Sequence, residues 1–432
     1  FKLAGWLAEI IRNKKRLLRL KESVAIGQIS GNYGTIKKGY LNLENGSRQL
    51  VNSTIACVIK NQLEYPDRLP LYGLGVDHVD SKNDLPRGRT SSFLAQSLKT
   101  KNKFLLFFIF VSLNITSEDL TIMSFNVENL FDSKDNPKKT DDTYLPLSEK
   151  NNSTHFNKCQ KINVKKWRDD CLFLDWNEKV IEKKIHNILQ VLNSKNVDVI
   201  SFQEVENIEV LKTLQKGLND KELKHIALID GQDDRGINLG IISKLPIKKS
   251  KLHPINFEGV SKEVQDDTRG ILETEIMLGK RVINIYSVHF PAGYHPTSMR
   301  LDAFNNLEKL VNQHSNISIA LGDFNVNITE DTNQNIYKNL SNNWEIAHLS
   351  GCEACDGTQY YFRNGTWSFL DNLMIFKGRG ARFENDSIEV VKHPLQTDSN
   401  GIQIRFNSLS GIGVSDHFPI MGTVSISENA KN

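Results

Sequence analysis

Four short motifs rich in acids and amides each follow a run of strand-forming apolar residues. They are SFNVENLF (124–131), ISFQEVEN (200–207), IALGDFNVN (319–327) and SDHFP (415–419). An α/β scaffold presents its chemistry at strand ends and in the loops after them. We therefore expect these four segments, although far apart in the chain, to converge on one site.

The charge of the chain is unevenly distributed. Residues 1–100 hold 16 Lys and Arg against 8 Asp and Glu, whereas residues 101–432 hold 38 against 43. The part that carries the motifs is therefore mildly acidic, and its overall charge provides no non-specific attraction to nucleic acid. Any binding of phosphate by this part would depend on local cations and on metal.

The periodicity of the chain predicts alternating strands and helices. Residues 120–127 and 197–205 read as buried strands, and 177–194 as an amphipathic helix. A second helix is predicted over 298–314, with Leu301, Phe304, Leu307 and Leu310/Val311 as its core face. Residues 132–175 are polar and read as a long surface insertion.

The ordered motifs resemble the endonuclease/exonuclease/phosphatase superfamily, whose founding member is deoxyribonuclease I. The resemblance covers roughly 121–428 and continues between the motifs. The linking segments are DRG (234–236) before LGIIS (239–243), RG (269–270) before ILETEIM (271–277), VINIYSVHF (282–290) and WSFLDNLMIF (367–376).

This resemblance implies the fold, an α/β (α+β) four-layer sandwich of two mixed β-sheets flanked by helices. Helices on both outer faces would suit strands that are apolar almost throughout. The domains expected are an unassigned leader (1–97), a signal-peptide-like segment (98–117) and the family domain (118–428).

The resemblance also implies phosphoester hydrolysis with Mg²⁺, with Mn²⁺ or Ca²⁺ as alternatives. Carboxylate oxygens are the hard ligands that Mg²⁺ prefers. We expect Glu204 as the first metal ligand and Glu128 as a second, since Glu128 follows Asn126 by two residues and period-2 alternation puts both on one face. Asp416 would reach the same region.

The remaining site residues follow from the same resemblance. Asp323 would position or deprotonate the attacking water, and Asn325 would hold a phosphate oxygen. His417 would act as a general base or as a cation that binds the phosphate. Asp371 would orient His417 through its other ring nitrogen.

Three further residues complete the expected set. Asn126 would hydrogen-bond the phosphate or orient Glu204, and His289 would protonate the leaving group or bind phosphate. Arg300 would bind phosphate, with a solvated helix start as the alternative. The abasic-site branch of the superfamily carries Tyr-x-Pro-Asn where this chain has Ser-Val-His-Phe at 287–290, which argues against abasic-site repair.

Residues 101–117 have the pattern of a secretory signal. Two lysines precede the apolar run 104–113, which is too short to span a bilayer as a helix. The alternative is a buried strand or core helix. We expect translation to start near Leu98 and residues 1–97 to form no stable fold, although a genuine small domain is the competing interpretation. Within that leader, residues 16–35 resemble part of adenylosuccinate lyase.

The cysteines are compatible with export. After Cys57 in the leader, an even number remain: Cys159, Cys171, Cys352 and Cys355. Local pairing, Cys159 with Cys171 and Cys352 with Cys355, is the arrangement expected among three possible ones. Zinc at Cys352 and Cys355 is the alternative.

These observations predict a secreted or periplasmic endonuclease of low sequence specificity that acts on DNA or RNA. A sphingomyelinase-like phospholipase or a phosphomonoesterase is the first alternative, with a phospholipid or a phosphorylated small molecule as its substrate. A catalytically inactive binding module is the second. We expect a monomer with no stable protein partner.

Overall fold

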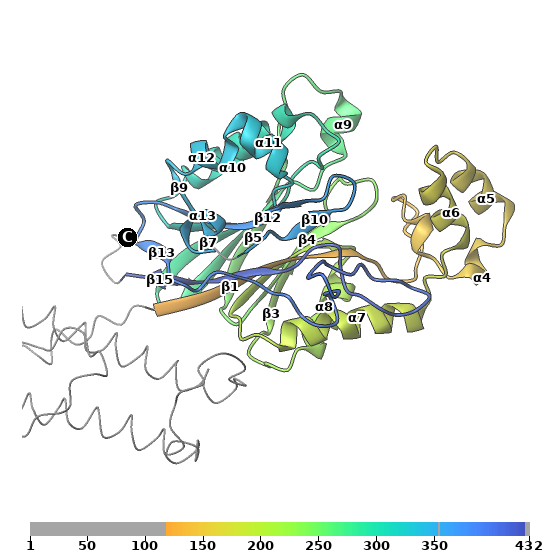
Figure 1. Cartoon of the computed structure of the whole chain (residues 1–432), viewed down its shortest axis with the longest axis horizontal. Helices are drawn as coiled ribbons and strands as arrows, with labels where there is room; N and C mark the ends of the chain where they lie inside the picture. Colours follow the sequence, from red (N-terminus) through yellow and green to blue (C-terminus); the bar gives the residue numbers. More distant parts are fainter. Residues whose placement is uncertain (1–117, 353–354, 428–432) are drawn as a thin grey trace, which may run out of the picture. The chain divides into compact units, whose positions relative to one another are not determined.

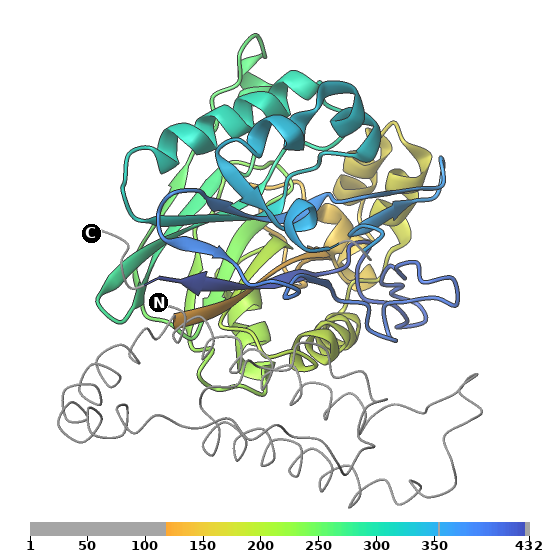
Figure 2. The ribbon, with the colours of Figure 1, turned by 60° about the vertical axis from the view of Figure 1, so that its left-hand side comes forward.

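The computed structural model describes residues 118–352 and 355–427. The predictions for residues 1–117, including the signal-peptide-like segment, lie outside this range. Within it the strands form two large mixed sheets that pack face to face, with helices on their outer faces (Figures 1 and 2). The predicted fold class is confirmed.

The first sheet holds seven strands in the order β13-β15-β1-β2-β4-β3, with β14 paired to β15. Their bounds are β1 Glu118–Leu130, β2 Val199–Val205, β3 His225–Leu228, β4 Asn238–Ser243, β13 Ala381–Phe383, β14 Glu389–Val390 and β15 Ile420–Ile426. β1 and β2 are parallel, while β15 runs antiparallel to β1. The carboxyl ends of β1 and β2 therefore lie beside the amino end of β15.

The second sheet holds six strands in the order β5-β6-β7-β8-β12-β9. Their bounds are β5 Ile247–His253, β6 Ile271–Leu278, β7 Arg281–His289, β8 Ile317–Asp323, β9 Trp344–Ile346 and β12 Asp371–Phe376. β7 and β8 are parallel, and β12 is antiparallel to β8. In this register Asp323 pairs with both His289 and Asp371.

The helices lie outside the sheets or in the connections between them, together with the small hairpin of β10 and β11. Their bounds are η1 Asp142–Tyr144, α4 Leu147–Lys150, α5 Ser153–Gln160, α6 Lys165–Phe173, α7 Glu178–Asn193, α8 Ile208–Gly217, α9 Lys262–Asp266, α10 Thr297–Val311, α11 Ile328–Gln334, α12 Ile336–Leu340 and α13 Ala347–Ser350. The hairpin strands are β10 Gln359–Tyr361 and β11 Thr366–Ser368. In the part of the chain that is described, no helix is both long and apolar enough to cross a membrane.

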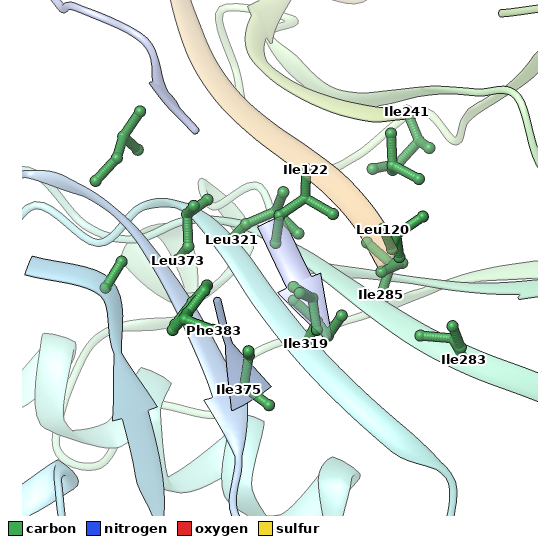
Figure 3. Close-up of a cluster of buried hydrophobic side chains, with 14 of the residues drawn as sticks. Leu120, Ile122, Ile241, Ile283, Ile285, Ile319, Leu321, Leu373, Ile375 and Phe383 are labelled. Atoms are coloured by element: carbon green, nitrogen blue, oxygen red, sulfur yellow. The ribbon is translucent and has the colours of Figure 1, made fainter. Parts of the chain in front are cut away.

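The central core lies between the two sheets (Figure 3). Leu120 and Ile122 of β1 meet Ile283 and Ile285 of β7 and Ile319 of β8 there, all buried. The alternate residues of β1 face the other way. Met123, Phe125 and Val127 pack with residues of α7 and α8. β1 is therefore buried on both faces, which explains its nearly continuous apolar sequence.

The insertion after β1 contains helices that the sequence did not predict. Residues 132–175 form η1 and α4 to α6, beyond the end of β1 (Figure 1). The helices are short and polar, so their periodicity is weak. A disulfide between the buried residues Cys159 and Cys171 connects α5 to α6. The predicted pairings Cys159–Cys171 and Cys352–Cys355 are both confirmed.

The core face of α10 agrees with the prediction at Phe304, Leu307 and Val311 but not at Leu301. Leu301 is 40% exposed, whereas Met299, Arg300 and Ala303 are buried alongside Phe304. The expected stripe is thus rotated towards Arg300, because the guanidinium finds an acidic partner inside the protein that an apolar-stripe argument does not anticipate.

Candidate active site

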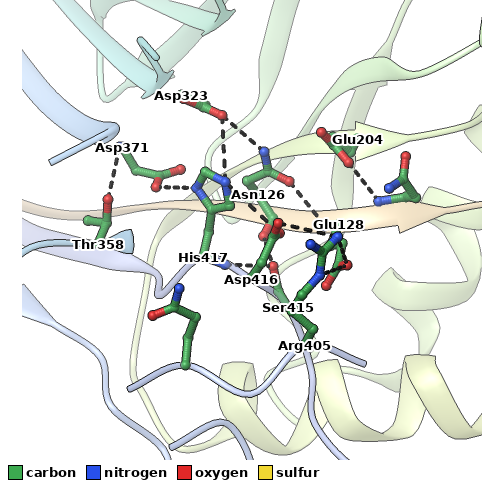
Figure 4. A network of polar contacts seen from close by, with 12 residues as sticks. Asn126, Glu128, Glu204, Asp323, Thr358, Asp371, Arg405, Ser415, Asp416 and His417 are labelled. Carbon is green, nitrogen blue, oxygen red and sulfur yellow. Dashed lines mark hydrogen bonds and ion pairs between the residues drawn. The ribbon is translucent and has the colours of Figure 1, made fainter. Parts of the chain in front are cut away.

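Three of the four motifs supply side chains to one buried cluster that spans both sheets (Figure 4). Asn126 Nδ2, from β1, donates to Asp323 Oδ2, from β8, at 3.1 Å. His289 Nε2 lies 3.5 Å from the same carboxylate oxygen, and His417 Nε2 lies 4.0 Å from it. Asp323 is therefore the centre of the cluster.

His417 is oriented by Asp371, as the sequence predicts. The His417 Nδ1 atom lies 2.7 Å from Asp371 Oδ2, and both residues are buried. The backbone N–H of Asp371 donates to Thr358 Oγ1 at 3.0 Å, which holds the backbone of Asp371 in place. With Nδ1 engaged, Nε2 is directed towards Asp323 and Asp416, each at 4.0 Å.

The fourth motif, ISFQEVEN, adds Glu204 at the edge of the cluster. Glu204 Oε1 lies 3.9 Å from His289 Nε2, and Glu204 Oε2 accepts a hydrogen bond from the backbone N–H of Asn129 at 2.8 Å. That bond connects the ends of the parallel strands β1 and β2. All four motifs are therefore brought together.

Strained backbone marks the ends of these strands. Glu128, Asn129, Glu204 and Asn325 all have positive φ, between 51° and 63°. This left-handed conformation is unfavourable for residues other than glycine, and such residues cluster at functional sites. The neighbouring Gly322 has φ +151, and a Cβ atom there would lie 2.0 Å from the Val288 carbonyl oxygen.

The positive φ angles correct the prediction that Asn126 and Glu128 lie on one face of β1 by simple alternation. The ladder between β1 and β2 shifts register between Asn126 and Leu130, so simple alternation does not hold at Glu128. Glu128 turns instead to Arg405, whose Nε donates to Glu128 Oε1 at 2.7 Å. In the same way, Asn325 lies beyond the end of β8, and its Nδ2 donates to the Phe290 carbonyl at 3.0 Å.

Two cations near the site were missed in the sequence. Arg405 contacts Glu128 and also Asp416, with Nη2 at 3.5 Å from Asp416 Oδ2. Lys184 is buried in α7, with Nζ 5.0 Å from the ring centre of Phe406. No motif signals Arg405, but Lys184 precedes Ile185 and follows Ile181 by three positions, so helical spacing places it on the buried stripe.

Burial and charge tune the ionisable groups in opposite directions. Burial raises the pKa of Asp323, although the positive charge of His417 opposes this. Burial lowers the pKa of His417, but the negative charges of Asp371, Asp323 and Asp416 outweigh it and hold the pKa well above its usual value. Burial, together with Arg269, Arg235 and His417, lowers the pKa of His289 well below the usual value.

These shifts favour one of the two roles considered for His417. A histidine with a raised pKa remains an imidazolium at neutral pH and suits a cation that binds a phosphate oxygen. A buried carboxylate with a raised pKa, as at Asp323, is the better acceptor for a proton from water. His289 is neutral at that pH, so it would hydrogen-bond the ester rather than carry charge.

The oxygen atoms around Glu204 fit a divalent cation. Glu128 Oε2 is buried and has no hydrogen-bond partner among the described residues. Burial, followed by the charge of Asp416, raises the pKa of Glu128. A cation bound by Glu204, Glu128 and Asp416 would restore the charged carboxylate. When bound, such an ion would neutralise charge on a phosphoester and polarise it.

Asp323, Asp371 and His417 form a second group close enough to share an ion, since one ligand atom of each lies within 4.8 Å of the others. Asp371 Oδ2 is already engaged by His417, and Asp323 Oδ2 by Asn126. Glu204 Oε2 and Glu128 Oε1 are engaged in the same way, and Asp371 Oδ1, like Glu128 Oε2, has no partner among the described residues, so this group is a second candidate for the ion.

Arg300 does not join the cluster, which corrects its predicted role. Its guanidinium is buried and paired with Glu330, with Nε 2.9 Å from Oε2. Nη1 donates to the carbonyls of Pro291 and Ala292, and Nη2 to that of His295. These bonds commit the guanidinium to holding the loop between β7 and α10, so Arg300 is a structural residue.

Comparison with known proteins agrees with the geometry of the site. Residues 176–382 match the model of the Endonuclease/Exonuclease/phosphatase family. Among curated proteins, adenylosuccinate lyase from Synechocystis is 63% identical over only 35 residues, so the chain spans 8% of the length of that relative.

Similar solved structures each align with about 71 or 72% of the chain. An endonuclease/exonuclease/phosphatase family protein from Bacteroides thetaiotaomicron is 14% identical with a TM-score of 0.46, over 72% of this chain and 99% of its own. One from Leptotrichia buccalis is 18% identical with a TM-score of 0.44, over 71% and 100%. D. rerio TDP2 complexed with single-strand DNA product is 13% identical with a TM-score of 0.43, over 71% and 99%.

Members of the matched family hydrolyse phosphoester bonds and generally depend on a divalent metal. The part of the chain that spans residues 176–382 belongs to the endonuclease/exonuclease/phosphatase family.

Proposed function

We propose that the protein is a secreted or periplasmic, Mg²⁺-dependent phosphodiesterase, an endonuclease that cleaves DNA or RNA with low sequence specificity. One observation carries this proposal: side chains from four distant motifs meet in one cluster around Asp323, between the buried residues His289 and His417. Such a site provides a proton acceptor and a phosphate-binding cation within one cluster.

The composition of the site supports a diester over a monoester. Five carboxylates lie in or beside the cluster: Glu128, Glu204, Asp323, Asp371 and Asp416. A diester carries one negative charge, whereas a monoester carries nearly two at neutral pH, so the diester meets less repulsion. A hydrolytic site that recognises the shared backbone of nucleic acid has no need to read its sequence.

Export is supported by two features. Both disulfides join cysteines that lie in the family domain, and disulfides persist in oxidising compartments. The signal-like pattern of residues 101–117 precedes that domain directly.

The first experiment is hydrolysis by the purified protein in Mg²⁺ and in EDTA. The substrates are plasmid DNA, RNA, sphingomyelin and a phosphomonoester, and the variants are His417→Ala and the matched His186→Ala on the exposed side of α7. We expect nicking of DNA or RNA that needs Mg²⁺, is lost in His417→Ala and persists in His186→Ala.

Other outcomes would revise the proposal. Intact nucleic acid together with a cleaved lipid or monoester would replace the nuclease with a sphingomyelinase-like or phosphomonoesterase activity at the same site. Absence of hydrolysis of every substrate would favour a binding module.

A further inference from the structure

Arg235 differs from the other arginines around the cluster, because its guanidinium makes no hydrogen bond in the part of the chain that is described. Arg269 donates to Asp233 and to the Phe290 carbonyl, while Arg405 and Arg300 pair with buried glutamates. Within residues 118–352 and 355–427, Arg235 makes no side-chain hydrogen bond, and its nearest acidic partner is Asp233, 3.9 Å from Nε. Its side chain is 49% exposed.

The strand pairing holds Arg235 beside the candidate metal ligands. β4 runs antiparallel to β2 with Asn238 opposite Val205, so the loop before β4 lies next to Glu204. Asp233 joins this loop to the second sheet, since its Oδ2 accepts from Arg269 Nη1 at 3.1 Å. Arg269 in turn binds the carbonyl of Phe290, the residue after His289. An uncommitted guanidinium at this position is suited to bind a phosphate oxygen.

Tyr294 presents an exposed aromatic ring at the same edge. The residue is 82% exposed and follows His289, the last residue of β7, by five positions. Its ring packs on that of His295, with the ring centres 4.2 Å apart. Arg269 joins the two loops, because it binds Asp233, two residues before Arg235, and the carbonyl of Phe290, four residues before Tyr294.

The loop that carries Tyr294 is held in place from inside. Arg300 donates to the carbonyls of Ala292 and His295, which flank Tyr294 on either side, and to that of Pro291. A buried arginine therefore fixes the backbone on both sides of an exposed ring. A solvent-facing tyrosine on a rigid loop loses little entropy when a planar group stacks on it.

We propose that Arg235 and Tyr294 form a subsite for the nucleotide unit next to the scissile bond, where Arg235 binds a phosphate oxygen and Tyr294 stacks on the base. This inference rests on the proposed function and narrows it to substrates that carry a planar base. Base stacking of this kind tolerates any sequence, because every base has an aromatic face. A phospholipid has no planar group that could stack on Tyr294.

The test uses the full-length protein and single-stranded oligonucleotides with one cleavable phosphodiester. One oligonucleotide has ordinary nucleotides on both sides of that bond, and the other has abasic ones. Tyr294→Ala is compared with Tyr294→Trp, with Arg235→Gln and with Phe173→Ala. The last is a matched control because it removes an exposed ring, 69% accessible, from the insertion. Circular dichroism and thermal melting verify the fold of each variant.

We expect Tyr294→Ala to lower kcat/KM about 5- to 150-fold on the ordinary oligonucleotide and hardly at all on the abasic one. Tyr294→Trp and Phe173→Ala should retain activity on both. Arg235→Gln should lower kcat/KM on both by about 10- to 100-fold, since it acts through phosphate.

Two results would overturn the inference while the proposed function stands: unchanged activity of Tyr294→Ala, or an equal loss on both oligonucleotides. Failure of the wild-type protein to cleave any oligonucleotide would overturn the proposed function and the subsite together.

Discussion

Asn126 and Asp323 join the two sheets at the centre of the site. Asn126 Nδ2 donates to Asp323 Oδ2 at 3.1 Å, although 197 residues separate them in the chain. The same amide accepts from the backbone N–H of Glu128 through Oδ1 at 3.0 Å. One side chain therefore sets both the carboxylate at the centre of the cluster and the strained end of β1.

Replacement of Asn126 should therefore weaken activity more than stability. Asn126→Ala is expected to lower kcat/KM about 100-fold or more, because Asp323 loses its fixed orientation. The free energy of unfolding should fall by about 1–3 kcal/mol, since a buried acceptor loses a partner. Asn306→Ala is the control, because the Asn306 amide donates only to carbonyls at the surface. An active Asn126→Ala protein would show that the bond merely supports packing.

Metal binding should be visible without any measurement of activity. If Glu204 is a ligand, Mg²⁺ will raise the melting temperature of the wild-type protein, with about 2.7 kcal/mol of stabilisation at 100 times Kd. Glu204→Gln keeps the size of the side chain but removes its charge, so this shift should shrink strongly. Glu222→Gln, at an exposed position, should leave it unchanged. An equal shift in Glu204→Gln would place the ion elsewhere, with the Asp323, Asp371 and His417 group as the next candidate.

The sequence predicts the site well wherever a motif ends a regular strand. Apolar runs identify β1, β2, β8 and β12. Parallel pairing brings Asp323 and His289 to one edge of the second sheet, and the packing of the two sheets places Asn126 beside them. Strand register places Asp371 opposite Asp323, but His417 lies in the loop before β15, so its pairing with Asp371 was predicted from the resemblance of the SDHFP motif and not from register.

The features of the site that the sequence did not predict depend on backbone geometry and on ion pairs between residues far apart in the chain. Positive φ at Glu128 and Asn325 breaks the alternation of the strand, and no local preference predicts it. Arg405 reaches Glu128 across 277 residues from a loop without a motif. Arg300 looked like a phosphate ligand because its partner, Glu330, lies 30 residues later in a separate helix.

The pH dependence of activity should report the pairing of His417 with Asp371. The Asp371 carboxylate raises the pKa of His417, so Asp371→Asn should lower it. The imidazolium would then be lost at lower pH, and the alkaline limb of kcat/KM should move by about one pH unit or more towards acid. The measurement is a pH profile at saturating Mg²⁺, with the His417 ring followed by NMR.

The raised pKa of His417 also makes the free energy of unfolding depend on pH. The folded pKa of His417 lies above its unfolded value, so its contribution to the free energy of unfolding is complete below about 6.5 and is lost as pH rises through the folded value. Asp371→Asn should remove most of that contribution at neutral pH, whereas Asp356→Asn, at an exposed site, should not. An unmoved alkaline limb would mean that another group controls it.

Glu273, which lies away from the site, makes a contribution to the free energy of unfolding that is lost in acid. Its carboxylate receives hydrogen bonds from Asn284 and Tyr286 and contacts His253 at 2.8 Å. The bond to His253, although opposed by burial, lowers the pKa of Glu273 to about 2. This depressed pKa contributes stability above the unfolded value of about 4.5, and that stability is lost as pH falls through about 2.

Glu273→Gln should therefore be less stable than wild type by about 1–3 kcal/mol at pH 5, with the difference vanishing near pH 2. Denaturant unfolding at a series of pH values measures it. Glu275→Gln, two residues further along β6, is the control, because it removes an ion pair with Lys248. It should change stability by less than about 1 kcal/mol. A difference that persists at pH 2 would trace the effect to packing.

Replacement of Arg300 should lower the free energy of unfolding and loosen the loop before α10. It should not change the affinity of the protein for the substrate phosphate. Arg300→Met fills the space but leaves Glu330 as a buried carboxylate without its partner, which should cost about 3–5 kcal/mol. The double variant Arg300→Met/Glu330→Met removes both charges and should recover most of that loss.

Because Arg300 also holds the carbonyls around Tyr294, the double variant should still cleave nucleic acid, but with a higher KM, as the loop becomes free to move. Denaturant unfolding and steady-state kinetics on the two variants separate these effects. Full stability in Arg300→Met together with a loss of phosphate affinity would restore Arg300 to the phosphate-binding role that the sequence suggested.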